Sequence, residues 1–200
     1  MVQKPIEELK NYMEWKDLVY FTKREEWRKW LEDNFDKKVE IWIVFPRKNS
    51  GQLSITYNDA VEEALCFGWI DSTVKALDKD RKIQRFTPRN PKSSYSQANI
   101  ERLKWLSDKS MIHPSLTEEV KLIIQQDFKF PSDILDTIKR DSVAWNNYQN
   151  FSDSYKRIRI AYINSARKRP DEFKKRLDNF ISKTKEGKQI SGYGGIEKYY

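Results

Sequence analysis

Apolar positions near the start of the chain recur with the period of a helix. Trp27 and Leu31 are four residues apart and fall on one helical face. Thr22 and Glu25 have the spacing of a capping box, in which two side chains satisfy the first backbone N–H groups of a helix. The pattern therefore predicts a helix over about 22–34.

Further along, apolar and polar residues follow the period of strands. The run VEIWIVF at 39–45 is β-branched and aromatic, which is typical of a strand. Alternating residues at 69–77 and 82–88 flank the turn sequence DKDR, so these two segments are predicted to pair as an antiparallel hairpin. Regular pairing from that turn brings Asp71 close to Arg89.

Helical spacing returns between and after these strands. Ala60 and Ala64 share one face of the segment YNDAVEEALCF, and Gly68 suits the left-handed position that ends a helix. Ser96 is a predicted N-cap, and Ser115 begins a second capping box with the glutamate three residues later. The last predicted helix carries an apolar stripe made by Phe173, Leu177, Phe180 and Ile181.

These elements predict an α+β fold, in which a small antiparallel sheet packs with helices and a mostly helical half follows. We expect an α+β region over 1–110 and a helical region over 111–186 packed on it, the two together forming either two domains or one. Residues 187–200 contain small turn-forming residues without a period, which predicts a mobile tail; docking of its aromatic side chains is the alternative.

Composition narrows the classes of protein that this chain can represent. With 38% apolar residues and 7 Trp, 10 Tyr and 10 Phe, the 200 residues can bury a core. One cysteine and one histidine provide neither an internal disulfide nor the usual four zinc ligands, so no metal and no cofactor is expected. The chain has no apolar run of signal-peptide or transmembrane length, so we expect a cytoplasmic protein without membrane insertion.

The net charge of +8 is concentrated in two segments. Residues 81–109 contain 8 Lys and Arg against 2 acidic residues, and residues 151–200 contain 13 against 6. Such segments attract phosphates, nucleic acids or acidic protein surfaces, although a solvated helix face rich in lysine gives the same pattern.

Several motifs together resemble the bacteriocin-protection, YdeI/OmpD-associated family. They are EIWIVFPRKNSG, YNDAVEEALCFGWIDS, RFTPRNPKSSYSQAN and the helical second half, and the resemblance covers about 15–185 with 60–99 as its specific part. Tyr95 replaces the family's usual Trp, and residues 169–177 depart from its C-terminal helix motif. The resemblance implies an α+β region followed by helices, and a role linked to bacteriocin or antimicrobial-stress tolerance rather than a known reaction.

The predicted binding site lies where the hairpin meets the loop that follows it. Arginine forks, hydroxyl groups and free N–H groups at a helix start can together hold a small anionic ligand. Structural roles are the alternative, because Asp71 can form a salt bridge and Trp69 can pack in the core. The candidate residues are Trp69, Asp71, Lys75, Arg85, Arg89, Lys92, Ser94, Tyr95, Ser96 and Asn99.

Other functions stay open at this point. Basic residues alternate with aromatic ones in YKRIRIAY and FKKRL, as in nucleic-acid-binding surfaces, and a protein partner is a further alternative. No catalytic residue is assigned, because the common catalytic motifs are missing, Cys66 lies in an apolar helix end and His113 has no evident partner. A metal-independent enzyme acting through the same hairpin residues is the last alternative.

Overall fold

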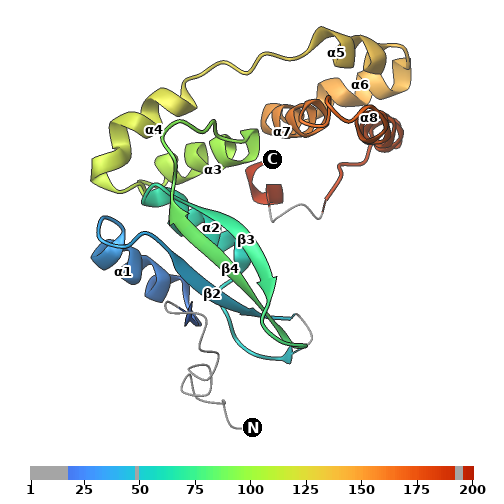
Figure 1. Ribbon diagram of the computed structural model, residues 1–200. Coiled ribbons are helices and arrows are strands. Elements are labelled where there is room, and N and C mark those ends of the chain that lie inside the picture. Colours follow the sequence, from blue (N-terminus) through green and yellow to red (C-terminus); the bar gives the residue numbers. More distant parts are fainter. Residues whose placement is uncertain (1–17, 48–49, 192–195) are drawn as a thin grey trace. The chain divides into compact units, whose positions relative to one another are not determined.

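A four-stranded mixed sheet forms the centre of the first part of the chain in the computed structural model (Figure 1). The strands are β1 (Leu18–Val19), β2 (Ile41–Pro46), β3 (Trp69–Ala76) and β4 (Arg81–Pro88). Their order in the sheet is β1-β2-β4-β3, with β1 parallel to β2 and the other neighbours antiparallel. The α+β prediction and its three strands are confirmed, and β1 is an addition because two residues are too few to show a period.

The structure describes residues 18–47, 50–191 and 196–200. The chain divides into two compact units, the first made by residues 1–93 with 110–117 and the second by residues 94–109 with 118–200. Among the described residues, no helix combines the length and the apolar character needed to cross a membrane.

Two helices, α1 (Arg24–Asn34) and α2 (Tyr57–Cys66), pack on one face of the sheet. Trp27 of α1 links all three elements. It is fully buried, its ring centre lies 5.6 Å from that of Phe86 in β4, and its indole N–H donates to the carbonyl of Ala60 in α2 at 3.0 Å. The apolar helix faces predicted from the sequence therefore form the core of this unit.

Both capping boxes predicted from the sequence are wrong in detail. Helix α1 starts at Arg24, so the capping carboxylate is that of Glu26 and not that of Glu25. The Glu26 carboxylate accepts a hydrogen bond from the backbone N–H of Thr22 at 2.8 Å. Ser115 lies inside the short 3-10 helix Pro114–Leu116, which precedes helix α4 (Thr117–Ile124). Its hydroxyl contacts the ring of His113 instead of capping a helix.

The hairpin of β3 and β4 contains an irregularity that the sequence pattern does not reveal. The register shifts between Asp71 and Val74, which places Asp71 opposite Phe86. The predicted contact between Asp71 and Arg89 is therefore wrong, since that contact assumed regular pairing from the turn. Gly68, just before β3, has the predicted left-handed conformation, with φ of +71°.

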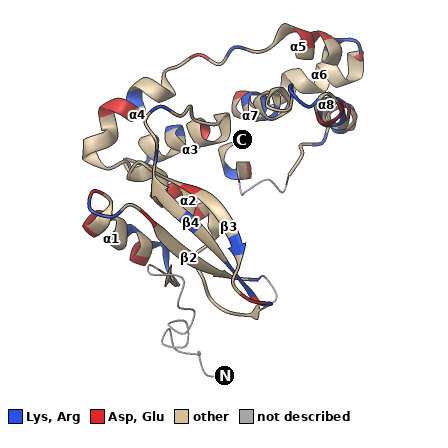
Figure 2. Cartoon of the chain, viewed as in Figure 1, with Lys and Arg blue, Asp and Glu red and all other residues tan. Residues whose placement is uncertain are grey.

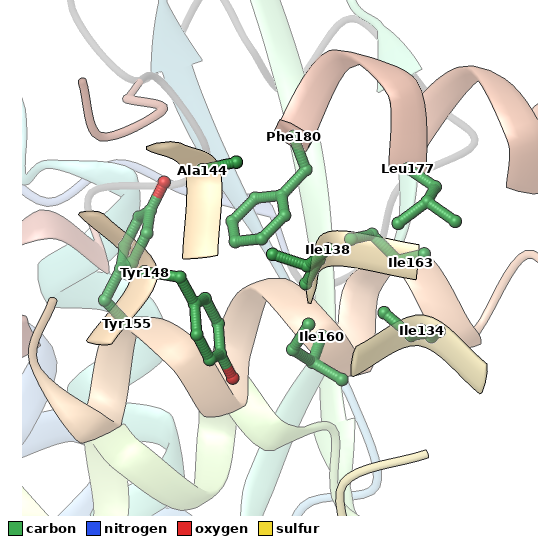
Figure 3. Packing of buried hydrophobic residues seen from close by; sticks show 9 residues of the cluster. All are labelled: Ile134, Ile138, Ala144, Tyr148, Tyr155, Ile160, Ile163, Leu177 and Phe180. Carbon is green, nitrogen blue, oxygen red and sulfur yellow. The ribbon is translucent and has the colours of Figure 1, made fainter. Parts of the chain in front are cut away.

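The described residues of the second unit form helices joined by loops, without a strand. The helices are α3 (Gln97–Asp108), α4 (Thr117–Ile124), α5 (Ser132–Lys139), α6 (Ser142–Asn150), α7 (Asp153–Asn164) and α8 (Pro170–Lys185). Its core gathers side chains from α5, α6, α7 and α8, including Ile138, Tyr155, Ile163 and Phe180, which converge in Figure 3. The predicted stripe on the last helix is confirmed, because Leu177 and Phe180 are buried in this core.

The end of the chain packs against α7 through a short 3-10 helix, η4 (Ile196–Tyr199). Ile196 and Tyr199 are buried together with Ile158 of α7, and Trp105 packs against the same cluster. Residues 192–195, part of the predicted mobile tail, lie outside the described residues. The described end fits the alternative in which the aromatic side chains of the tail dock.

Candidate functional site

Two of the predicted site residues face the helices of the first unit. Trp69 is buried, and its indole N–H donates to the carbonyl of Phe35 at 3.0 Å. The carboxylate of Asp71 accepts a hydrogen bond from the hydroxyl of Tyr57 in α2 at 2.7 Å. Both side chains thus take part in packing α1 and α2 on the sheet.

Lys75 and Arg85 lie on the opposite face of the sheet. Arg85 is paired with Trp42 of β2, and its Nε donates to the carboxylate of Glu40 at 2.9 Å, which lowers the pKa of Glu40. The ammonium group of Lys75 lies 5.4 Å from the ring centre of Trp42. Because neighbouring side chains of a strand point to opposite faces, the sheet separates this pair from Trp69 and Asp71.

The other predicted residues follow β4. Arg89 donates from Nη2 to the carbonyl of Ser93 at 2.9 Å, and Lys92 is exposed on the same loop. Ser94, Tyr95, Ser96 and Asn99 belong to the second unit, where Ser94 is exposed, Tyr95 is half-buried and Ser96 caps α3 by accepting the N–H of Asn99. The predicted set thus comprises both sheet faces, one loop and the start of α3.

A buried network of acids and arginines, which was not predicted from the sequence, joins α1 to α2. Glu62 and Glu63 are 0% and 1% exposed. Arg24 donates to Glu62 at 2.7 Å and also binds Glu63 and Asp59, while Arg28 donates to Glu63 at 2.9 Å. Two glutamates inside an apolar helix face, with two arginines one turn apart on α1, are the signal that points to it. The network anchors one helix on the other.

Cys66 is buried, whereas His113 has a hydroxyl partner, Ser115, that the sequence did not reveal. Burial raises the pKa of the Cys66 thiol to about 12, as its position in an apolar run predicts. The His113 ring lies 4.7 Å from the ring of Phe35 and 5.2 Å from that of Phe67, and its Nδ1 is 2.8 Å from the Ser115 hydroxyl. Among the described residues, no three His, Cys, Asp or Glu side chains are grouped to hold a metal ion.

A cavity of about 350 Å³ lies between α7, α8 and the segment that follows α8. Three cationic residues and one acidic residue line it, and charged segments of both signs are visible along α7 and α8 in Figure 2. This site was not predicted from the sequence, although its residues belong to the second basic segment. The lining residues are Arg159, Tyr162, Ile163, Glu172, Lys175, Arg176, Asn179, Phe180, Ile190 and Ser191.

Arg159 is the buried cation of this cavity, with 4% of its surface exposed. Its Nη2 donates to the carbonyl of Ile190 and to the hydroxyl of Tyr200, the latter at 2.8 Å. Its Nε is buried and has no acceptor among the described residues. The guanidinium lies 5.5 Å from the ring centre of Tyr155. The group is held in place while part of its hydrogen-bonding capacity is unused.

Arg176 is also held by its neighbours. Its Nε donates to the Glu172 carboxylate at 2.8 Å, which lowers the pKa of Glu172, and its Nη1 donates to the carbonyl of Tyr162 at 2.8 Å. Its guanidinium carbon lies 3.8 Å from the centre of the Tyr162 ring. Lys175 is exposed beside it and forms no hydrogen bond or ion pair with a described residue. The cavity thus combines two pre-positioned guanidinium groups with one exposed ammonium group.

The aromatic rings in the basic stretches of the second unit are buried to different degrees, and Tyr162 lines the cavity. Tyr155 is fully buried, and Phe173 packs against the core. Arg157 donates to the buried Glu101 at 2.7 Å. The burial of Tyr155 leaves fewer rings in these stretches for the base stacking that nucleic-acid binding would use.

Comparison with known proteins gives two matches to family models. Residues 19–119 match a family described as Domain of unknown function (DUF8412). Residues 127–187 match the family Bacteriocin-protection, YdeI or OmpD-Associated, which confirms the predicted resemblance for that part of the chain. The segment 60–99, on which the resemblance mainly depended, falls in the first match instead. No curated protein and no solved structure matches the chain.

Proposed function

This chain belongs to the family described as Domain of unknown function (DUF8412), and we propose that it is a non-catalytic binding protein for a small anionic ligand. The match of 127–187 to the YdeI/OmpD-associated family supports a role in bacteriocin or antimicrobial-stress tolerance. Most of the cavity between α7 and α8 lies inside that match, and we place the ligand there.

The observation that carries this proposal is a buried arginine at a cavity with excess positive charge. Desolvating a guanidinium group is costly unless hydrogen bonds and opposite charge compensate it, and Arg159 has two neutral acceptors and no carboxylate partner among the described residues. Three cations face one carboxylate in the lining, so a bound anion would supply the missing charge. The held guanidinium groups would lose little side-chain entropy on binding.

The hairpin is a weaker location for the anion. Arg85 already donates to the Glu40 carboxylate, and the sheet separates it from Trp69 and Asp71. An anion bound at Arg85 would have to compete with an intramolecular carboxylate at very high effective concentration. The cavity of the second unit has no such competitor at Arg159.

The side chains that line the cavity are better suited to binding than to catalysis. Glu172 is the carboxylate at the cavity, and its pKa is lowered by the hydrogen bond from Arg176, so it stays ionised at neutral pH and is poorly suited to act as a general acid. The lining contains no cysteine or histidine. Binding is therefore the activity that these side chains support best.

Calorimetric titration with inorganic phosphate, sulfate and citrate at constant ionic strength tests the proposal. Lys175→Gln should weaken anion binding by about tenfold without changing stability, because one charge-assisted hydrogen bond contributes on the order of 1.5 kcal/mol. Lys174→Gln is the matched control. Lys174 is the preceding residue of α8, is 78% exposed, pairs with Asp178 and does not line the cavity.

The two variants separate a defined site from general electrostatic attraction. Equal weakening by both substitutions would mean that anions respond only to the net charge of the helix, and would refute the site. Binding of none of the three anions to the wild type would refute the proposed function itself.

A further inference from the structure

The hydrogen bonds that hold the two arginines also restrict what each can still donate. An arginine grips a planar carboxylate best through two parallel N–H groups on one edge of its guanidinium group. Every such edge involves Nη2 paired with either Nε or Nη1. The anion that the cavity can recognise therefore depends on which of these N–H groups already donate to an acceptor within the protein.

In Arg176, Nε is taken by Glu172 and Nη1 by the carbonyl of Tyr162 and the hydroxyl of Ser165. Only Nη2 has no acceptor among the described residues. In Arg159, Nη2 is taken by Ile190 and Tyr200, which interrupts both edges, and Nη1 has no described acceptor. Neither arginine thus offers a complete fork.

The cavity instead offers single donors from three different side chains, Arg159, Arg176 and Lys175. The three terminal oxygens of a phosphate monoester can each accept from a different donor, whereas a carboxylate has two oxygens in one plane. The lining carries three positive charges against one negative charge, which matches a dianion. From this arrangement we infer that the cavity selects phosphate monoesters over carboxylates of the same charge.

The remaining lining indicates what the phosphate is attached to. Ile163, Phe180 and Ile190 contribute apolar side chains to the same cavity. A volume of about 350 Å³ is in the lower range of ligand pockets, with room for more than a free phosphate ion. The ligand is thus a small organic phosphate with an apolar group. This inference rests on the proposed function, because it concerns the same site.

The test compares phenyl phosphate, isophthalate and inorganic phosphate by calorimetric titration of the full chain at constant ionic strength. Isophthalate is a dicarboxylate with a comparable ring. Phenyl phosphate should bind about tenfold more tightly than isophthalate and several-fold more tightly than inorganic phosphate, as one additional charge-assisted hydrogen bond and a buried ring predict. Its affinity should increase as the pH rises through about 6, where the second phosphate proton dissociates.

One variant tests the fork argument directly. Glu172→Ala releases Nε of Arg176, which restores a complete Nε and Nη2 edge, so isophthalate should gain affinity relative to phenyl phosphate by several-fold. Asp171→Ala is the matched control, because it removes the neighbouring negative charge of α8 from a residue outside the lining. That control should leave the ratio of the two affinities unchanged, and circular dichroism verifies that both variants fold.

The outcomes distinguish this inference from the proposed function. If none of the anions binds, both are refuted. If isophthalate binds the wild type as tightly as phenyl phosphate, or if Asp171→Ala changes the ratio as much as Glu172→Ala, the phosphate selectivity is refuted while anion binding stands. If inorganic phosphate binds as tightly as phenyl phosphate, the assignment to an organic ester is refuted.

Discussion

Removal of Glu63 should destabilise the first unit strongly, because its carboxylate is the shared partner of Arg24 and Arg28. Breaking a buried ion pair by deleting one partner costs roughly 3–5 kcal/mol. The lower end applies here, since the arginine side chains are 23% and 31% exposed and Arg24 keeps its ion pairs with two other carboxylates. We expect Glu63→Ala to lower the free energy of unfolding by about 3 kcal/mol.

Urea unfolding followed by tryptophan fluorescence measures this change, with Glu32→Ala as the matched control. Glu32 also pairs with Arg28, but at 3.5 Å and with its side chain 44% exposed, so its removal should cost less than about 0.5 kcal/mol. If the two substitutions lower the free energy of unfolding equally, the buried network is not what anchors α1 on α2, and the reasoning fails.

Three further predictions concern other parts of the fold. In urea unfolding, Gly68→Ala should lower the free energy of unfolding by about 2 kcal/mol and Gly51→Ala by about 1 kcal/mol. Both glycines have positive φ, but only at Gly68 would an added Cβ contact another side chain, that of Leu116 at 3.3 Å. Equal effects would contradict the packing argument. Cys66 should not react with a thiol reagent at pH 8 until the protein is unfolded, because the pKa of its buried thiol is about 12, and rapid native labelling would contradict this. Burial raises the pKa of Tyr148 to about 12, so on raising the pH the hydroxyl loses its proton in the unfolded state before it does so in the folded state. The free energy of unfolding should therefore fall between about pH 10 and 12, and it should fall less in Tyr148→Phe. Identical pH profiles of the two proteins would refute the assignment.

The candidate site was less predictable than the fold. The sequence brought Asp71, Arg85 and Arg89 together through an assumed regular hairpin, but alternation places Arg85 on the face opposite Asp71, and the register shift changes the residue opposite Asp71. A bulge depends on how a strand fits its neighbours in the sheet, which leaves no local signal. The donors that Arg159 and Arg176 present at the cavity between α7 and α8 depend on which of their N–H groups already have acceptors. Several of these acceptors are 14 or more residues away in the sequence.

The sequence by itself determined the α+β class, the three main strands, the helical second half, the helix end at Gly68 and the buried state of Cys66, because periodicity, β-branching and backbone conformational preference are local properties. Only the tertiary structure decided the parallel β1, the burial of Glu62 and Glu63, and the positions of Arg159 and Arg176 at one cavity. A charged residue is predicted from the sequence to be exposed, because charged side chains are rarely buried without a partner. The partners that allow its burial come from other elements of the fold.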